Sequence, residues 1–513
     1  MTQQTEPKTG PEHRRDAPLA MKADEFRRVG HQLVDTVAAF LESLPGRPVT
    51  RAESPEAIRA ALDASRPLPD EGKDAGALVD RAVRLLVDHS LFNGHPRFFG
   101  YVTSPPAPIG ILADLLAAAI NPNVGAWRLA PMASEIEAQA VRWIAELAGF
   151  PAHGGGLLVS GGNMANLVGF LAARAAVPSH DVRRTGLAGG PQLRVYASEE
   201  THTWIHKAAD LSGLGTDAIA WIRTDARQRM DVAALRAAIA RDVGAGARPM
   251  LVVGTGGSVS TGAVDPLPEI AAVCREAGAW FHVDGAYGGF AALAAGAPPD
   301  LRGLALADSV ALDPHKWLYA PLEAGCTLVR RPGALRDAFS YHAPYYHFGQ
   351  EATNYLDLGP QNSRGFRALK VWLALQHAGR SGCLRMIEDD MRLSRRLYER
   401  VAEHPELEAC TQDLSITTFR FVPHDLRSRA SDGEVAPYLD TLNQDVLERV
   451  QNSGEAFVSN AVVGGRYLLR ACIVNFRTGE ADVDALPGIV ARLGREADAS
   501  LRAAGSFPFR TRP

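Results

Sequence analysis

Asp313-Pro314-His315-Lys316-Trp317 directly follows Ser309–Leu312, an apolar stretch with the character of a buried β-strand. The run sets one lysine among an acid, a histidine and an aromatic residue. Burial beside other cationic groups lowers the pKa of a lysine amine, and such an amine can bond to the carbonyl of a cofactor near neutral pH. A lysine taken alone is more often a surface residue, so the interpretation of Lys316 depends on other segments.

A second apolar segment, Trp280–Val283, ends at Asp284 and is followed by small residues. An acid at the carboxyl end of a buried strand faces the crevice where open α/β sheets bind ligands. The alternative is an acid that only caps the next turn. Pyridoxal phosphate needs a lysine for its aldehyde and an acid for its pyridine nitrogen. Asp284 and Lys316 together supply both groups.

A glycine-rich turn, Gly161-Gly162-Asn163, follows the apolar stretch Leu157–Ser160 and precedes a helix predicted to run through Ala175. Glycines let backbone N–H groups approach a phosphate, and a helix N-terminus adds partial positive charge. The turn matches neither G-x-G-x-x-G nor the Walker pattern, which disfavours a nucleotide site. His202, one of 15 histidines, follows the strand-like stretch Leu193–Ala197, so its imidazole could stack on a flat ring or hold a carboxylate at the same sheet edge.

These four segments resemble the group II pyridoxal-phosphate-dependent decarboxylases, which include the aromatic-L-amino-acid, histidine and glutamate decarboxylases. The resemblance covers about residues 95–380 and continues more weakly to the end. It implies an α/β fold of type I, with a mainly parallel sheet covered by helices, and a homodimer. Further matching segments are His95–Tyr101, Ala286–Gly289 and Arg364–Trp372.

The resemblance also implies roles for single residues. Lys316 would carry the Schiff base, Asp284 would pair with the pyridine nitrogen, and His202 would stack on the cofactor and orient the substrate carboxylate. Gly162, Asn163 and His315 would hold the phosphate. Asp313 stands where animal aromatic decarboxylases have asparagine. An acid would repel a phosphate unless a cation lay between them, so we do not assign Asp313 to the phosphate.

Two other segments match the walls of the site. Thr255 matches a residue that lines the cofactor, but the segment after it is longer than in the aromatic decarboxylases, so Ser258 is an alternative. Tyr101, Val102 and Ser104 match the wall that contacts the substrate. In a region where the match needs a gap, Ala126 would enlarge the pocket and Trp127 would reduce it.

The segment Phe339–Phe348 resembles the mobile catalytic loop of the family. Tyr345 falls on the tyrosine that protonates the quinonoid intermediate after carbon dioxide leaves. Tyr346 and Phe348 are close enough to be alternatives for that position. The choice matters, because related enzymes with phenylalanine there tend to react with oxygen and yield an aldehyde.

We therefore expect a decarboxylase that converts an L-amino acid, with an aromatic one favoured, to the amine and carbon dioxide. An aldehyde synthase on the same scaffold and a decarboxylase of an acidic or aliphatic amino acid are the near alternatives. An aminotransferase would require a keto acid and release no carbon dioxide. A protein that binds the cofactor without turnover is the alternative from another class.

Composition agrees with a globular cytoplasmic enzyme. Hydrophobic residues make up 46% and charged residues 22% of the chain. The net charge is -4 and the chain has no basic run, so its charge does not indicate nucleic-acid binding. The five cysteines show no CxxC spacing, which favours reduced thiols and no metal site. The apolar run Ile109–Ile120 contains Asp114 and is too short to span a membrane.

We predict four parts along the chain. Residues 1–20 form a disordered tail, 21–94 an N-terminal helical segment, 95–379 a large cofactor-binding α/β domain and 380–513 a small C-terminal α+β domain. The remaining strands predicted for the large domain are Ala218–Ile222, Met250–Gly254 and Cys326–Val329, and those for the small domain are Ser415–Phe421 and Tyr467–Ile473.

Overall fold

The computed structural model describes residues 17–178, 180–341 and 352–505. Residues up to Phe92 form one compact unit, and residues from Asn93 form a second. Residues 1–16 of the predicted tail lie outside the described part of the chain. None of the helices in that described part combines the length and the apolar character needed to cross a membrane.

The first unit is helical. Ser54 and Asp74 begin two of its helices, because each side chain accepts a hydrogen bond from a backbone N–H in the first turn, at 3.2 and 2.9 Å. Pro45 lies two residues after the last residue of the first helix and cannot supply a backbone N–H to extend it. The elements are α1 (Ala23–Ser43), the 3-10 helix η1 (Leu44–Gly46), α2 (Pro55–Leu62) and α3 (Ala75–His89).

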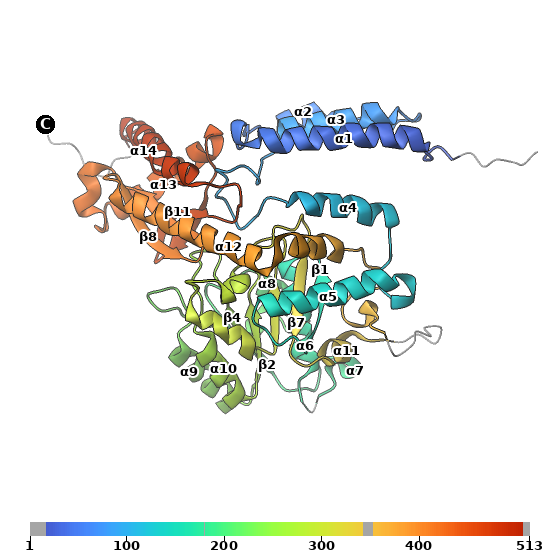
Figure 1. The fold of residues 1–513 in the computed structure, drawn as a ribbon. Helices are drawn as coiled ribbons and strands as arrows, with labels where there is room; N and C mark the ends of the chain where they lie inside the picture. Colours follow the sequence, from blue (N-terminus) through green and yellow to red (C-terminus); the bar gives the residue numbers. More distant parts are fainter. Residues whose placement is uncertain (1–16, 179, 342–351, 506–513) are drawn as a thin grey trace, which may run out of the picture. The chain divides into compact units, whose positions relative to one another are not determined.

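The second unit contains a seven-stranded sheet with the strand order β1-β7-β6-β5-β4-β2-β3. Figure 1 labels β1, β2, β4 and β7 of this sheet. Strands β2 to β6 pair in parallel, whereas β7 is antiparallel to both β6 and β1. The predicted mainly parallel sheet is confirmed, with each predicted strand present. The strands are β1 (Gly155–Val159), β2 (Leu193–Ser198), β3 (Ile219–Ile222), β4 (Arg248–Thr255), β5 (Trp280–Asp284), β6 (Ser309–Leu312) and β7 (Gly325–Val329).

Helices cover both faces of this sheet, as the continuous apolar strands require. Along β2, Val195 and Ala197 belong to a buried cluster with residues of helices α6 and α8 on one face, while Tyr196 between them belongs to the cluster that contains residues of α9 and α10 on the other. The helices of this region are α4 (Pro108–Ile120), α5 (Pro131–Leu147), α6 (Gly162–Ala175), α7 (Val182–Thr185), α8 (Trp204–Leu211), α9 (Val232–Gly244), α10 (Leu267–Ala277) and α11 (Ala334–Phe339). Short 3-10 helices are η2 (Trp127–Leu129), η3 (Thr216–Ala218), η4 (Gly288–Leu293), η5 (Pro299–Leu306) and η6 (Tyr355–Asp357).

A smaller antiparallel sheet, with the order β10-β11-β9-β8, follows in the C-terminal part. The edge strands β8 and β10 were not predicted from the sequence. Edge strands tolerate polar residues, and these two lack a continuous apolar pattern. The strands are β8 (Leu407–Asp413), β9 (Ile416–Phe421), β10 (Ser459–Val463) and β11 (Arg466–Cys472).

Three helices pack on the small sheet around a core of their own. The first of them, α12, also reaches the core of the large sheet, and Gly379 interrupts its helical geometry with φ 64° and ψ 167°. The elements are α12 (Ala368–Glu403), the 3-10 helix η7 (His424–Arg429), α13 (Ala436–Ser453) and α14 (Glu480–Ala503).

Candidate active site

A cavity of about 440 Å³ lies at the carboxyl edge of the large sheet. Strand β1 runs in the same direction as β6, because β7 is antiparallel to both, so the turns after β1, β5 and β6 all reach this edge. The lining comes from residues 101–103, 160–164, 166, 202, 259, 284, 286–287, 313 and 315–316.

Asp284, the last residue of β5, is buried and forms one wall of the cavity. Its carboxylate accepts a hydrogen bond from the indole N–H of Trp204 at 2.7 Å and one from the backbone N–H of Ala286 at 3.2 Å. Both donors are neutral. They stabilise the carboxylate and leave its negative charge available to a cationic group in the cavity.

His282 lies on the same face of β5 as Asp284, since side chains two residues apart in a strand point the same way. Burial lowers the pKa of His282 to about 4, so the ring is neutral. Its Nε2 lies 2.7 Å from Asn166 Oδ1, which can only accept, and its Nδ1 lies 2.7 Å from Ser309 Oγ. The ring therefore carries its proton on Nε2 and orients the amide of Asn166, which lines the cavity.

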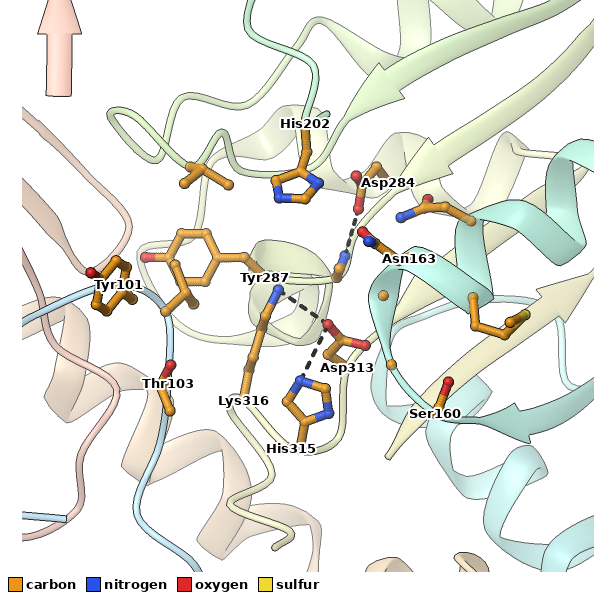
Figure 2. A pocket seen from close by; sticks show the side chains of 17 residues that line it. Tyr101, Thr103, Ser160, Asn163, His202, Asp284, Tyr287, Asp313, His315 and Lys316 are labelled. Carbon is orange, nitrogen blue, oxygen red and sulfur yellow. Dashed lines mark hydrogen bonds and ion pairs between the residues drawn. The ribbon is translucent and has the colours of Figure 1, made fainter. Parts of the chain in front are cut away.

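Lys316 lies opposite His202 in the cavity, close to a second carboxylate (Figure 2). Its Nζ is 3.1 Å from Asp313 Oδ2, and the Nε2 of His315 is 3.6 Å from the same oxygen. Nδ1 of His315 accepts the backbone N–H of Ala324 at 3.1 Å, so Nε2 bears the hydrogen that faces Asp313. Burial lowers the pKa of His315. The cation beside Asp313 is therefore Lys316. Such a cation is what allows an acid to lie near a phosphate.

The glycine turn between β1 and α6 approaches this group closely. Gly161 has φ 150°, a backbone conformation that favours glycine. A Cβ on Gly162 would lie 2.7 Å from Asp313 Oδ2, and one on Gly161 would lie 3.1 Å from the His315 ring. The absence of these carbon atoms lets the turn, which leads into a 14-residue helix, pack closely against Asp313 and His315 at the cavity.

His202 follows the end of β2 and faces the cavity from the side opposite Lys316 (Figure 2). Its Nδ1 accepts the backbone N–H of Trp204 at 3.4 Å. Burial lowers the pKa of His202, which favours the neutral ring. A neutral imidazole in this place offers one flat face and one N–H to a ligand.

Most of the residues predicted for the site share this cavity. Ser104 and Thr255 do not line it: the Ser104 hydroxyl donates to the carbonyl of His315 at 2.8 Å, and the buried Thr255 hydroxyl has no hydrogen-bond partner in the described part of the chain. Ser258 pairs with the Thr261 hydroxyl at 3.0 Å. The predicted residues in the lining are Tyr101, Gly162, Asn163, His202, Asp284, His315 and Lys316.

The loop tyrosine Tyr345 and its alternatives Tyr346 and Phe348 lie outside the described residues. Sequence reasoning missed Trp204 and Asn166, although Trp204 lies two residues after His202 and Asn166 lies three residues after Asn163. His282 lies two residues before Asp284 in the same strand. This spacing could have predicted that the His282 side chain is on the same face and supports the site, as it does by orienting Asn166. Nothing in the sequence signals the contact between Trp204 and Asp284, which are 80 residues apart.

The donor set fits pyridoxal phosphate. The cavity holds an amine for an aldehyde, a carboxylate for a ring nitrogen, and a glycine turn at a helix N-terminus for a phosphate. In the described residues, no group of three or more histidine, cysteine or acidic side chains is arranged to hold a metal ion.

Comparisons with known proteins agree with this chemistry. The chain is 31% identical over 465 residues to the aromatic-L-amino-acid decarboxylase of Bacillus atrophaeus, covering 90% of this chain and 93% of that one. It is 28% identical to the phenylacetaldehyde synthase of a Rosa hybrid cultivar, covering 88% and 91%. The crystal structure of Oryza sativa TDC with PLP and tryptamine matches with a TM-score of 0.86 and 28% identity, covering 94% of this chain and 99% of that one.

The chain also matches a conserved domain that defines a whole protein family. Residues 55–422 match the pyridoxal-dependent decarboxylase conserved domain. The expected type I fold and the expected cofactor, pyridoxal phosphate, are confirmed by these relatives. The chain belongs to the pyridoxal-dependent decarboxylase family.

Proposed function

We propose that this pyridoxal-phosphate-dependent decarboxylase acts on an aromatic L-amino acid and releases the amine and carbon dioxide, with Lys316 as the covalent anchor of the cofactor. The observation that carries the proposal is the meeting of Lys316, Asp284, His202 and the Gly161-Gly162 turn around one cavity. The match to decarboxylases over most of the chain supports it.

Each residue has a distinct task in this proposal. When bound, pyridoxal phosphate supplies an electron-withdrawing ring that takes up the electrons released as the substrate loses carbon dioxide. Asp284 holds the ring nitrogen in its protonated form through its negative charge. His202 covers one face of the ring and orients the substrate carboxylate. Asp313 Oδ2, 3.1 Å from Lys316 Nζ, holds the amine in place until it reacts.

The phosphate and the final proton are assigned to other groups. We assign the phosphate to Gly162, Asn163 and His315, with the N–H groups of the α6 N-terminus. Thr255 stays a proposed cofactor neighbour, although its hydroxyl does not line the cavity. Tyr345 is the proposed proton donor to the substrate α-carbon, which would make the amine the product.

An aromatic substrate is supported by the cavity walls. The lining includes Tyr101, Val102, Val259 and Tyr287, which offer apolar and aromatic surface. Lys316 is the only lysine or arginine in the lining contributed by the described residues, and its amine is assigned to the cofactor. The described wall therefore offers no spare cation for the distal carboxylate of an acidic amino acid. Ser104 stays a proposed substrate-binding residue. Its effect is indirect, because its hydroxyl ties the loop that carries it to the carbonyl of His315.

An aldehyde synthase is the second candidate, favoured by the 28% identity to phenylacetaldehyde synthase. That reaction consumes oxygen and converts the amino acid to an aldehyde, with ammonia, peroxide and carbon dioxide as the other products.

We also propose a cytoplasmic homodimer. Leu112, Leu115 and Ile120 of α4 expose about half or more of their surface, and such an apolar stripe suits burial against a second copy. The five free cysteines suit a reducing compartment. Light scattering on the active protein tests the dimer, and a monomer alone would contradict it. The domain limits 21–94, 95–379 and 380–513 remain proposals.

A carbon dioxide assay tests the function. Purified protein with pyridoxal phosphate is supplied with each common L-amino acid, and amine, ammonia and peroxide are measured in parallel. We expect carbon dioxide and an equal amount of amine from an aromatic amino acid. Peroxide with ammonia would establish the aldehyde synthase. Turnover of only glutamate, aspartate or aliphatic amino acids would overturn the aromatic assignment.

A further inference from the structure

Arg470 is a buried cation that stands close to the wall of the cavity. It lies on β11 of the small sheet and is 2% exposed. Its Nη1 donates to the carbonyl of Tyr101 at 3.2 Å and to the hydroxyl of Ser459 at 2.8 Å. Among the residues that the structure describes, its Nε and Nη2 have no hydrogen-bond partner, and no carboxylate forms an ion pair with it.

Other buried arginines in the described chain are balanced by acids. Arg364 pairs with Glu137, and Arg420 on the neighbouring strand β9 pairs with Glu408 at 2.7 Å. Burying a guanidinium without a counter-charge destabilises the folded chain, whereas an apolar side chain of similar length does not carry that cost. Packing alone therefore does not account for Arg470.

The residue that Arg470 holds has an unusual backbone. Tyr101 has φ 52°, in the left-handed region that is unfavourable for a tyrosine. Its N–H donates to Ser459 Oγ at 3.4 Å and its carbonyl accepts from Arg470, so Ser459 and Arg470 together hold both of its polar backbone groups.

The residues that the structure describes hold the Tyr101 side chain only weakly. The ring is 58% exposed and packs only loosely on Phe457, with ring centroids 6.1 Å apart. The segment before it is anchored to the small sheet, because Phe99 receives the N–H of Cys472 at 2.9 Å and donates to Phe457 at 2.7 Å. The backbone conformation of Tyr101 therefore determines where its ring stands on the cavity wall.

We propose that Arg470 is a positioning residue that holds Tyr101 in its left-handed conformation and so sets the wall that receives the side chain of the substrate. Through this contact the small C-terminal sheet, which supplies none of the described cavity lining, contributes to substrate affinity. The inference rests on the proposed function, since it takes the ligand of the cavity to be an amino acid.

The test uses the full-length holoenzyme with Arg470→Met. We expect KM for the best aromatic substrate to rise about tenfold, since one hydrogen bond from a charged donor is lost, with kcat changed less than about threefold. Spectral titration with the methyl ester of that amino acid, which lacks the free carboxylate, should show the same rise in Kd. Affinity for pyridoxal phosphate should not change. The melting temperature should equal or exceed that of the wild type.

Arg420→Met is the matched control, because Arg420 is equally buried in the adjacent strand but pairs with an acid. It should lower the melting temperature and leave KM unchanged. Ser459→Ala removes the hydroxyl that accepts the N–H of Tyr101 and should raise KM as Arg470→Met does. This variant also tests the inference if Arg470→Met fails to fold. Arg470→Lys should restore affinity only in part, since an ammonium lacks the planar fork.

A double-mutant cycle with Tyr101→Ala decides whether Arg470 acts through the tyrosine ring. If it does, adding Arg470→Met to Tyr101→Ala should change neither KM nor the Kd of the ester. Independent effects that multiply, or an unchanged KM in Arg470→Met and Ser459→Ala, would overturn the inference. If the wild type releases no carbon dioxide from any amino acid, the proposed function fails instead, and the ester titration still reports on Arg470.

Discussion

The two carboxylates that line the cavity are held in opposite ways. Asp284 accepts hydrogen bonds from neutral N–H groups, whereas Asp313 lies beside the Lys316 ammonium and the His315 ring. Neutral donors leave the negative charge of Asp284 to act on a ligand, whereas Lys316 beside Asp313 already balances the charge of that acid. One cavity can thus hold two acids, of which only Asp284 is available to a protonated ring nitrogen.

Removing the cation beside Asp313 should have the largest effect. Lys316→Ala should reduce decarboxylation below detection, because it removes the nucleophilic amine. Mass spectrometry after borohydride reduction of the holoenzyme should locate the cofactor on Lys316 in the wild type and on no residue in the variant. Lys370→Met is the control: this buried lysine pairs with Asp114 and does not line the cavity, so the label should remain. A label on another lysine in the wild type would contradict the assignment.

Neutralising each acid in turn tests the comparison directly. Asp284→Asn should lower kcat by on the order of a hundred- to a thousandfold, since it removes a fixed charge from the reacting group. Asp313→Asn should lower kcat by less than about tenfold, because the charge of Asp313 acts on Lys316 and not on the reacting ring. Steady-state assays at saturating pyridoxal phosphate measure both. Equal losses in the two variants would show that the acids do not differ in role.

Removing one neutral donor should have a smaller effect. Trp204→Phe keeps the ring in its buried site and deletes the 2.7 Å hydrogen bond to Asp284. A hydrogen bond to a charged group contributes about 1.5 to 3 kcal/mol, so we expect kcat to fall about tenfold or somewhat more. Trp221→Phe, at a half-exposed position on β3, should leave kcat unchanged. No loss in Trp204→Phe would mean that Ala286 alone suffices to hold the carboxylate.

A third buried acid extends the comparison to stability. Asp390 on α12 accepts hydrogen bonds from Trp317 Nε1 at 2.9 Å and from Tyr319 Oη at 2.7 Å. Burial nevertheless raises its pKa from 3.8 to about 7. The folded chain therefore binds this proton more tightly than the unfolded chain, and the free energy of unfolding should fall as pH rises from about 4 to about 7.

Asp390→Asn keeps an acceptor for both rings and removes the titration. The variant should be more stable than the wild type at pH 8, and the difference should shrink toward pH 4. Thermal unfolding across this range measures it. His282 acts in the opposite sense, since its pKa lowered to about 4 makes stability rise with pH, so only the difference between variant and wild type isolates Asp390. A difference that does not vary with pH would rule out the titration of Asp390.

The sequence predicted the parts of the site that follow from local pattern. Apolar strands that end on Asp284 or lead to Lys316 are visible as short runs, and parallel strands bring their carboxyl ends to one edge. The partners of these residues come from elsewhere in the chain and have no local signal. Arg470 is 369 residues from the carbonyl that it contacts. The edge strands β8 and β10 were missed for a related reason, since their pairing depends on neighbours more than on their own apolar pattern.

The reversed direction of β7 has a consequence for local unfolding. Because β6 and β7 are antiparallel neighbours and β7 also pairs with β1, the segment that carries Lys316 leaves and re-enters the sheet at the same edge. Opening that segment requires breaking paired strands at both of its ends. Amide hydrogens of β6 and β7 should therefore exchange with solvent among the slowest in the protein.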